Sequence, residues 1–424
     1  MKRRLPIHAD YLSPTNAHAL DLTFADTGLR PSGKVLGTNY LTYFPPATRQ
    51  SELLDDGTDL FHAPDSSFKY RLWTGGVFEV SPDSRNRRLR HRDHGPRRAV
   101  LLETISDLRV RGDKFFVGID RVPCLGFPQD VGDPVTPKHA DFNSQVGLDA
   151  SHSLTAAFFQ LDEAGRPQRK HLQDLVAFNK GLLPVLYERR WICFTRERPK
   201  LNTSPESTPL PGDVFLRHSL TTTPAMLFRF SALTFNAHAI HIDPEYTKQV
   251  YGLPDLLVHG PMTLHMLHCH AMQVADNYNA LGATKLRLDK IAYQNIAPIF
   301  VRDTIEIGCT TPVLVKKPVH RLRAEMWIAK RVGTGSDAGM AKCVKAEVHF
   351  HFNATAATKD ASQAAAQEDV DQSVIIDTPV PDSDDYNRTQ RKGSGMNIRK
   401  VEKVPKIPLR KGCWSDKVRY YAQD

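Results

Sequence analysis

The chain has 424 residues, more than one compact domain normally holds, so its length predicts two or three domains. Hydrophobic residues make up 41% and charged residues 24%, which excludes a wholly disordered chain, a fibrous repeat and a small disulfide-rich protein. No apolar run reaches the roughly 18 to 20 residues that cross a bilayer, and the N-terminus lacks the apolar segment of a secretion signal. We therefore expect an intracellular protein without a membrane span.

Cysteine spacing and charge bear on disulfides, metal sites and anionic partners. The six cysteines lie far apart without a Cys-x-x-Cys pair, so we expect reduced thiols and no structural zinc site. The net charge of +9 is concentrated in an Arg-rich stretch within residues 81–98 and in residues 388–411. Blocks of like charge are usually solvated loops and tails, although an anionic partner such as nucleic acid stays open.

The first half of the chain reads mainly as sheet. Residues 68–80 predict a strand interrupted at Gly75-Gly76, where missing side chains permit a bulge or a close backbone approach. Residues 99–119 alternate apolar and polar side chains around Arg111-Gly112-Asp113, which predicts a β-hairpin. An insertion over 123–153, which begins Pro/Gly-rich, separates this hairpin from a further predicted strand over 187–195.

The second half repeats this kind of architecture after a proline-rich linker at 198–213. We expect a strand over 214–230, a short helical turn over 244–252, a long helix over 260–281, and strands over 285–293, 304–314, 321–330 and 341–353. One long helix followed by an antiparallel meander is an α+β pattern. From residue 354 the apolar periodicity is lost, and we expect the tail over 354–424 to be largely disordered.

The side chains best suited to chemistry lie where we expect a strand to give way to a short helix. A carboxamide, Asn236, and two imidazoles, His238 and His241, fall within six residues. Histidine titrates near neutral pH, with a reference pKa of about 6.5, so such a pair can move a proton onto and off water. Gly260 begins the predicted long helix, whose free first-turn N–H groups can stabilise a developing oxyanion.

This window resembles the active-site motif of the MaoC-type hot-dog acyl-thioester hydratases, Asp-x-Asn-Pro-Leu/Ile-His, followed by a glycine that begins the central helix. The segment Leu233-Thr-Phe-Asn-Ala-His-Ala-Ile-His241 aligns to it without a gap. Asn236 stands at the Asp position, His238 at the Asn position and His241 at the His position. Gly260 takes the place of the oxyanion-hole glycine.

The N-terminal half adds a second set of motifs. Tyr43-Phe-Pro-Pro46, Asp56-Gly-Thr58 and Arg71-Leu-Trp-Thr-Gly-Gly76 occur in order, as in the two-hot-dog group of mesaconyl-C4-CoA hydratase and fungal mitochondrial 3-hydroxyacyl-thioester dehydratases. The resemblance spans roughly residues 12–353 and implies an α+β double hot-dog fold. It implies a non-catalytic hot-dog domain at 12–197 that completes the acyl tunnel and a catalytic one at 214–353. The two would form an intrachain pseudo-dimer, with further homo-oligomerisation left open.

The resemblance also implies a reaction, the reversible addition of water across the α,β bond of an acyl thioester. The substrate would be carried on coenzyme A or on the phosphopantetheine arm of acyl carrier protein, without another cofactor. His241 would activate water or protonate the departing hydroxyl, and the N–H of Gly260 would hold the thioester carbonyl oxygen. Asn236 would orient water or substrate, and His238 would be a second acid or base.

Further expectations concern substrate contacts and location. The resemblance assigns His259, Thr234 and Trp73 to substrate binding, and anionic carriers suit a basic enzyme. It also implies mitochondrial residence. The start Lys2-Arg3-Arg4, followed by acidic residues, is a poor transit peptide, so cytoplasmic residence is the alternative.

Two other functions stay open at this point. A hot-dog thioesterase would hydrolyse the same substrates but needs a carboxylate at the helix, and Asp255 is the only acid close before it. A non-catalytic protein that binds acyl groups or nucleic acid would use the run Arg85 to Arg98, although no RNA-binding aromatic motif accompanies that run. We predict no nucleic-acid partner.

A rival site lies on the predicted long helix. His265 and His268 share one helical face, as some metal ligands do, and Cys269 and His270 are their neighbours. No carboxylate or third ligand joins them at a suitable spacing. We interpret these residues as lining or packing the helix and predict no metal.

Overall fold

The computed structural model describes residues 8–29, 37–46, 48–81, 97–125, 183–281, 285–315, 320–333 and 338–352. These residues all fall within one compact unit, Met1–Pro381. Arg85 to Arg92, most of the predicted insertion over 123–153 and the predicted disordered tail over 354–424 lie outside the described residues.

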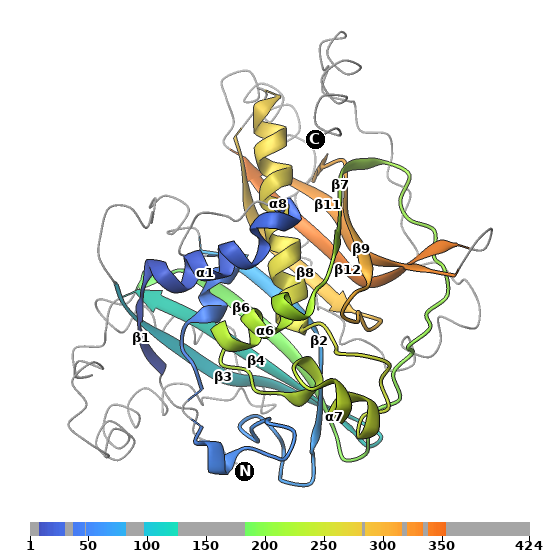
Figure 1. Ribbon diagram of the computed structural model, residues 1–424. Helices are drawn as coiled ribbons and strands as arrows, with labels where there is room; N and C mark the ends of the chain where they lie inside the picture. The colour runs from blue at the N-terminus through green and yellow to red at the C-terminus, as the bar shows by residue number, and fades with distance from the viewer. Residues whose placement is uncertain are drawn as a thin grey trace. The chain divides into compact units, whose positions relative to one another are not determined.

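One antiparallel sheet of twelve strands dominates the described fold (Figure 1). The strands are β1 His8–Leu12, β2 Tyr70–Val80, β3 Arg97–Arg111, β4 Lys114–Leu125, β5 Leu183–Pro184, β6 Leu186–Thr195, β7 Val214–Thr221, β8 Leu286–Asn295, β9 Thr304–Thr310, β10 Val313–Leu314, β11 Arg321–Val332 and β12 Gly339–Phe352. Neighbouring strands follow the order β1-β3-β4-β6-β2-β8-β12-β11-β9-β7, while β5 and β10 pair with β4 and β11 off this path.

The strand order is an internal repeat. Outward from the centre, one half of the sheet runs β2-β6-β4-β3-β1 and the other runs β8-β12-β11-β9-β7. In each half, the first strand along the chain lies at the outer edge and the second lies at the centre. The two halves therefore share one topology, and the predicted α+β double hot-dog fold is confirmed.

The halves are joined by the pairing of β2 with β8, from Gly75↔Gln294 to Glu79↔Lys290. Gly75 has a positive φ of 146°, and a Cβ on it would lie 2.3 Å from the Tyr293 carbonyl oxygen. A Cβ on Gly76 would lie 2.1 Å from the carbonyl oxygen of Arg189. The pairing of β2 with β6 also shifts register here, so the interruption predicted at Gly75-Gly76 is confirmed as a bulge with close backbone approach.

Among the residues that the structure describes, four α-helices accompany the sheet: α1 Pro14–Phe24, α6 Pro224–Leu233, α7 Pro244–Gln249 and α8 Gly260–Ala280. The first three begin with a capping side chain followed by proline. Ser13, Thr223 and Asp243 each accept a hydrogen bond from a backbone N–H of the first turn, while proline has no N–H to leave unsatisfied. These local signals fix where each helix starts.

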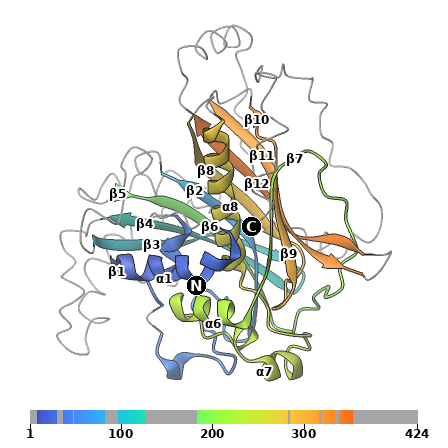
Figure 2. The same cartoon turned by 45° about the horizontal axis from the view of Figure 1, so that its top comes forward.

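The central helix α8 lies along the sheet (Figure 2). Every residue from Met262 to Ala271 is buried, so all faces of this part of the helix contact protein. It lies against β7, β8, β9, β11 and β12 of its own half and against β2 of the other half. The predicted long helix is confirmed. No helix among the described residues is long and apolar enough to cross a membrane.

Two predicted boundaries were wrong. Residues 222–230 were expected to continue a strand from 214, but β7 ends at Thr221 and α6 starts at Pro224. The apolar residues there follow the helical spacing, with Met226, Leu227 and Phe230 on the buried face. Pro123 was expected to open the insertion, but it belongs to β4, where its carbonyl oxygen accepts a hydrogen bond from Val185.

Candidate active site

The chain enters the predicted motif through the C-terminal cap of α6. Phe235 has a left-handed φ of 53°, and its N–H donates to the carbonyl of Ala232. The N–H of Asn236 donates to the carbonyl of Ser231 at 2.9 Å, which completes a Schellman cap. The hydroxyl of Thr234, a predicted substrate contact, donates to the Phe230 carbonyl at 2.7 Å and so also stabilises this helix end.

Asn236 sets the direction of the backbone that follows. Its Oδ1 accepts the backbone N–H of His238 at 3.1 Å, forming an Asx-turn. A 3₁₀ turn over Ala239–His241 then brings His241 close to His238, with ring centroids 5.4 Å apart. The amide of Asn236 thus positions the first histidine, and the orienting role predicted for it toward water or substrate stays a prediction.

His241 is buried with a defined tautomer. Its Nδ1 lies 2.6 Å from the carbonyl oxygen of Leu257, which can only accept, so Nδ1 carries the proton and Nε2 keeps a lone pair. Burial, with the neighbouring His259 and His238, lowers the pKa of His241 well below its usual value. His241 is therefore a neutral proton acceptor near neutral pH.

His259 supports His241 from one side. The two rings stack with centroids 3.7 Å apart and planes inclined by 22°. The Nε2 of His259 lies 2.7 Å from the hydroxyl oxygen of Ser231, and burial lowers the pKa of His259 to about 3. Because the His259 ring is fully buried, its position favours a supporting role, and the predicted substrate contact stays a prediction.

His238 faces two oxygen atoms that the sequence did not assign to the site. Its Nε2 lies 3.1 Å from the hydroxyl of Tyr251 and 3.3 Å from Oδ2 of Asp56. The Tyr251 hydroxyl donates to the same Asp56 oxygen at 2.7 Å. Thr58 donates from its backbone N–H and its hydroxyl to Oδ1 of Asp56. The histidine cluster therefore includes an anion from the N-terminal half.

The loop that carries Asp56 lies directly on the motif segment. Gly57 has a φ of 77°, and a Cβ on it would lie 2.1 Å from the Ala237 carbonyl oxygen. The carbonyl of Asp56 accepts the N–H of Ala239 at 2.7 Å. The N-terminal half was expected to lack catalytic groups and to complete the tunnel; in the structure its Asp56 carboxylate lies beside His238. In the sequence, the glycine in Asp56-Gly-Thr58 was the signal that could have predicted close backbone packing at this loop.

The start of α8 provides a free donor beside Trp73. No described residue accepts a hydrogen bond from the Gly260 N–H, the next residue is Pro261, and the N-cap His259 makes no side-chain cap. A Cβ on Gly260 would lie 2.7 Å from both Cβ and Cγ of Trp73. The indole N–H of Trp73 donates to the Tyr293 hydroxyl at 2.8 Å. The structure thus brings the predicted residues Gly260 and Trp73 into contact.

Gly260→Ala should lower both stability and activity, because the added methyl group must displace Trp73 or the helix start. Overpacking of this kind costs about 1–3 kcal/mol. Thermal unfolding and steady-state kinetics measure the two effects. Gly212→Ala is the matched control, since nothing lies within 4 Å of a Cβ at Gly212. An unchanged melting curve and kcat in Gly260→Ala would show that the contact with Trp73 does not constrain this position.

The histidines of the rival site have separate surroundings. His265 contacts the Thr38 hydroxyl through Nδ1 at 2.9 Å and Sγ of Cys269 through Nε2 at 3.5 Å. His268 packs against Phe78, and Nε2 of His270 lies 3.3 Å from the Leu216 carbonyl. Among the described residues, no group of three or more His, Cys, Asp or Glu side chains is arranged to hold a metal ion.

Buried histidines should make the fold sensitive to acid. Burial lowers the pKa values of His259 and His265 to about 3 and that of His270 to about 4. The native state binds fewer protons than the unfolded chain between these values and about 6.5, so stability is highest above that range and is lost on acidification. The free energy of unfolding should fall by about 1.4 kcal/mol per pH unit for each histidine.

Urea unfolding at several pH values between about 7 and 5 measures this slope. His265→Gln should give a shallower slope than the parent, because one buried imidazole is removed. A stability that does not change over this range would show that these histidines do not resist protonation in the native state.

Asp255, the acid on which the thioesterase alternative depends, has other partners. Its Oδ2 forms an ion pair with Arg302 at 2.8 Å, and its Oδ1 accepts the N–H of Leu256.

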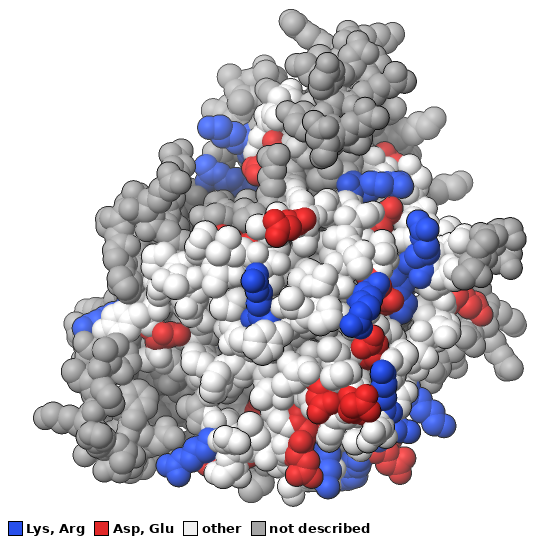
Figure 3. Space-filling view, in the orientation of Figure 1, with Lys and Arg blue, Asp and Glu red and all other residues white. Residues whose placement is uncertain are grey.

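Basic and acidic side chains are interspersed on the described face shown in Figure 3. The run Arg85 to Arg98, which a nucleic-acid-binding protein would use, lies mostly outside the described residues.

Comparison with known proteins identifies the family. Residues 163–301 match the family described as hydroxyacyl-thioester dehydratase type 2. The chain is 31% identical over 287 residues to the mitochondrial hydroxyacyl-thioester dehydratase type 2 of Schizosaccharomyces pombe, covering 66% of this chain and 77% of that protein. This chain belongs to the hydroxyacyl-thioester dehydratase type 2 family. The predicted resemblance to the two-hot-dog dehydratases is confirmed.

Other similarities of this dehydratase-family protein are partial or distant. It is 33% identical over 123 residues to mesaconyl-C(4)-CoA hydratase of Chloroflexus aurantiacus, an alignment that covers 27% of this chain and only 41% of that relative's length. A MaoC-like dehydratase structure from Phytophthora capsici matches with a TM-score of 0.46 at 12% identity, covering 83% of this chain and 96% of that one.

Proposed function

We propose that this dehydratase-family protein catalyses the reversible addition of water to a 2-enoyl thioester, giving a 3-hydroxyacyl thioester. One observation carries the proposal. His241 is held neutral, and no residue that the structure describes hydrogen-bonds to its Nε2. Its ring lies close to His238 and is stacked on His259, which precedes the α8 N-terminus. A proton acceptor and a free N–H donor are the two groups that this reaction needs.

In the hydration direction, His241 Nε2 accepts one proton of a water molecule as the water oxygen bonds to Cβ of the enoyl group. The electron pair of the double bond moves to Cα and the thioester carbonyl, and the Gly260 N–H stabilises the resulting oxyanion. One such donor is worth roughly 3 to 4 kcal/mol. The protonated His241 then delivers its proton to Cα, so no net proton is consumed. Dehydration follows the same steps in reverse.

His238 would hold the same water molecule. None of the described residues hydrogen-bonds to its Nδ1, while its Nε2 is occupied by Tyr251 and Asp56. Two imidazole acceptors can take both hydrogens of one water and leave its oxygen lone pair directed at Cβ. Asn236 would keep His238 in place through the Asx-turn. Asn236 itself does not exchange a proton.

An assay with purified full-length protein tests the proposal. Crotonyl-CoA, longer enoyl-CoA substrates and the same groups on acyl carrier protein should lose enoyl absorbance without releasing free thiol. In the dehydration direction, the corresponding 3-hydroxyacyl thioesters should gain enoyl absorbance. Release of free thiol would indicate a thioesterase instead. No conversion of any of these substrates would exclude a hydratase.

Carrier, partners and location belong to the same proposal. The names of the relatives include a CoA thioester and a mitochondrial protein, which supports an acyl thioester substrate and mitochondrial residence. The proposed reaction uses no further cofactor. Pairing of β2 with β8 supports an intrachain pseudo-dimer. A fluorescent fusion at the C-terminus tests location, and a signal confined to the cytosol would reject mitochondria.

A further inference from the structure

We propose that Asp56 of the N-terminal half is a positioning residue for His238: with the Tyr251 hydroxyl, its carboxylate fixes the Nε2–H tautomer and leaves the Nδ1 lone pair for the reacting water. This inference rests on the proposed hydratase function and deepens it. It makes the active site a product of both halves of the chain.

The hydrogen bonds around His238 decide its tautomer. A carboxylate oxygen only accepts, and the Tyr251 hydroxyl already donates its hydrogen to Oδ2 of Asp56 at 2.7 Å. The atoms that face Nε2 of His238, at 3.1 Å and 3.3 Å, therefore offer lone pairs alone. Nε2 must carry the proton, so Nδ1 of the neutral ring is an acceptor.

The carboxylate is itself held in one orientation and one charge state. Thr58 donates twice to Oδ1, which leaves Oδ2 for Tyr251 and His238. Burial alone would raise the pKa of Asp56, but the bonds from His238, Thr58 and Tyr251 outweigh it and lower the pKa well below the usual range. Burial and the nearby carboxylate raise the pKa of Tyr251, so its hydroxyl keeps the proton that it donates.

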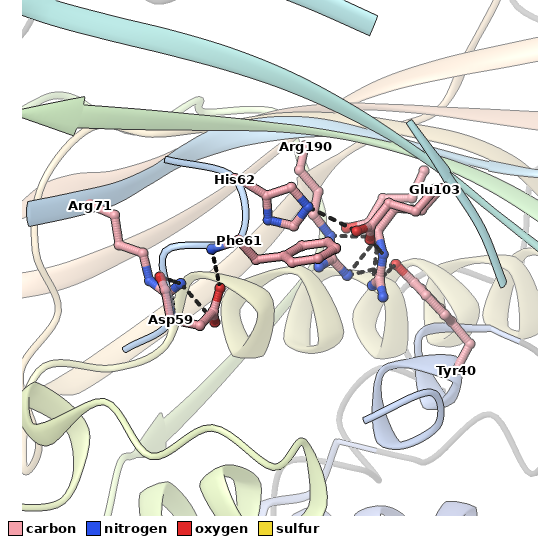
Figure 4. A network of polar contacts seen from close by, with 9 residues as sticks. Tyr40, Asp59, Phe61, His62, Arg71, Glu103 and Arg190 are labelled. Atoms are coloured by element: carbon pink, nitrogen blue, oxygen red, sulfur yellow. Dashed lines mark hydrogen bonds and ion pairs between the residues drawn. The ribbon is translucent and has the colours of Figure 1, made fainter. Parts of the chain in front are cut away.

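The N-terminal half anchors the segment that follows Asp56, as Figure 4 shows. Asp59 pairs with Arg71 of β2 at 3.3 Å and accepts the N–H of Phe61. His62 Nε2 lies 2.8 Å from Glu103 of β3. The segment is thus fixed to two strands of its own half. These contacts with β2 and β3 hold the segment so that Asp56 lies beside the C-terminal half of the chain.

No other described carboxylate contacts either of the two motif histidines. Asn236, at the position where the resembled motif has Asp, carries no charge, and Asp255 is paired with Arg302. Only 6% of the surface of Asp56 is exposed, so its carboxylate is not an ordinary solvated surface charge. Its negative charge therefore acts on His238.

Asp56→Asn tests the proposal in the full-length protein. The amide keeps Oδ1 for Thr58 but turns an N–H₂ toward His238 Nε2. This favours the Nδ1–H tautomer, whose Nδ1 cannot accept a hydrogen bond from the reacting water. We expect kcat for hydration to fall about 10²- to 10⁴-fold. KM should stay within a few fold, because Asp56 acts through His238 and not on the acyl chain.

Asp55→Asn is the matched control. It removes a carboxylate from the adjacent residue, which is exposed, and should keep the parent kcat. A kcat in Asp56→Asn equal to that of Asp55→Asn would overturn the proposal.

The tautomer can be measured without substrate. In protein labelled with ¹⁵N-histidine, the His238 signals, assigned by their loss in His238→Gln, should show a protonated Nε2 and an unprotonated Nδ1. Asp56→Asn should exchange the two. An unchanged tautomer would overturn the proposal. If the parent protein hydrates no enoyl thioester, the proposed function fails, but this measurement still decides whether Asp56 positions His238.

Tyr251→Phe provides a second variant if Asp56→Asn does not fold. It removes the hydroxyl that bridges Asp56 and His238 and leaves the carboxylate in place. We expect kcat to fall about tenfold, because one hydrogen bond to a charged group is lost, while the remaining carboxylate keeps Nε2 of His238 protonated. Parent activity with the parent tautomer in this variant would contradict the proposal.

Discussion

His241→Asn should lower kcat for hydration by about 10²- to 10⁴-fold while the protein stays folded. The asparagine N–H₂ can replace the Nδ1–H of His241 as donor to the Leu257 carbonyl, so the local structure keeps its hydrogen bond. The Nε2 lone pair, which would take the proton from water, has no counterpart in asparagine. Steady-state kinetics and a thermal melting curve measure activity and folding separately.

His349→Asn is the control for that substitution. His349 lies on β12 and pairs with Glu347, and it has no contact with the histidine cluster among the described residues. The control should keep parent activity. Activity of His241→Asn within a few fold of the parent, with an unchanged melting curve, would remove His241 from the mechanism.

The second large effect concerns the two halves of the chain. A fragment that starts near residue 205 should be insoluble or inactive, because it loses the β2 strand that covers β8. An exposed strand edge invites aggregation. The fragment also lacks Asp56 and Trp73, which contact His238 and Gly260. Soluble yield and hydration rate measure the loss.

A chain that ends near residue 355 is the contrasting variant. The last described strand, β12, ends at Phe352, so this truncation keeps the whole sheet and should keep its turnover. Full activity from the isolated C-terminal half would show that a homodimer of that half suffices. The intrachain pseudo-dimer would then have to be abandoned.

Local patterns predicted much of the fold. The long helix was found because residues 262–280 contain neither glycine nor proline after the start at Gly260-Pro261. The hairpin was found because apolar and polar residues alternate around Arg111-Gly112-Asp113. The error at α6 has a local cause, since only two residues separate this helix from β7 and its apolar residues suit either structure. The N-cap Thr223 before Pro224 was the signal that would have separated them.

The spacing of residues in the sequence groups only those candidate site residues that are neighbours in the chain. Asn236, His238 and His241 form one short segment, and a motif can show such a group. Tyr251 and Asp56 are separated by 195 residues, so their contact depends on how the two halves pair. Composition and periodicity do not contain that information. The motif Asp56-Gly-Thr58 marked the place without indicating what it contacts.

Isotope labelling of the product tests the central claim, water addition to an enoyl thioester, most directly. Full-length protein should convert crotonyl-CoA in H₂¹⁸O to a 3-hydroxyacyl thioester with ¹⁸O in its hydroxyl group and the thioester intact. In D₂O, deuterium should appear at Cα. Product with ¹⁸O in a free carboxylate, released together with CoA, would contradict the claim and indicate hydrolysis.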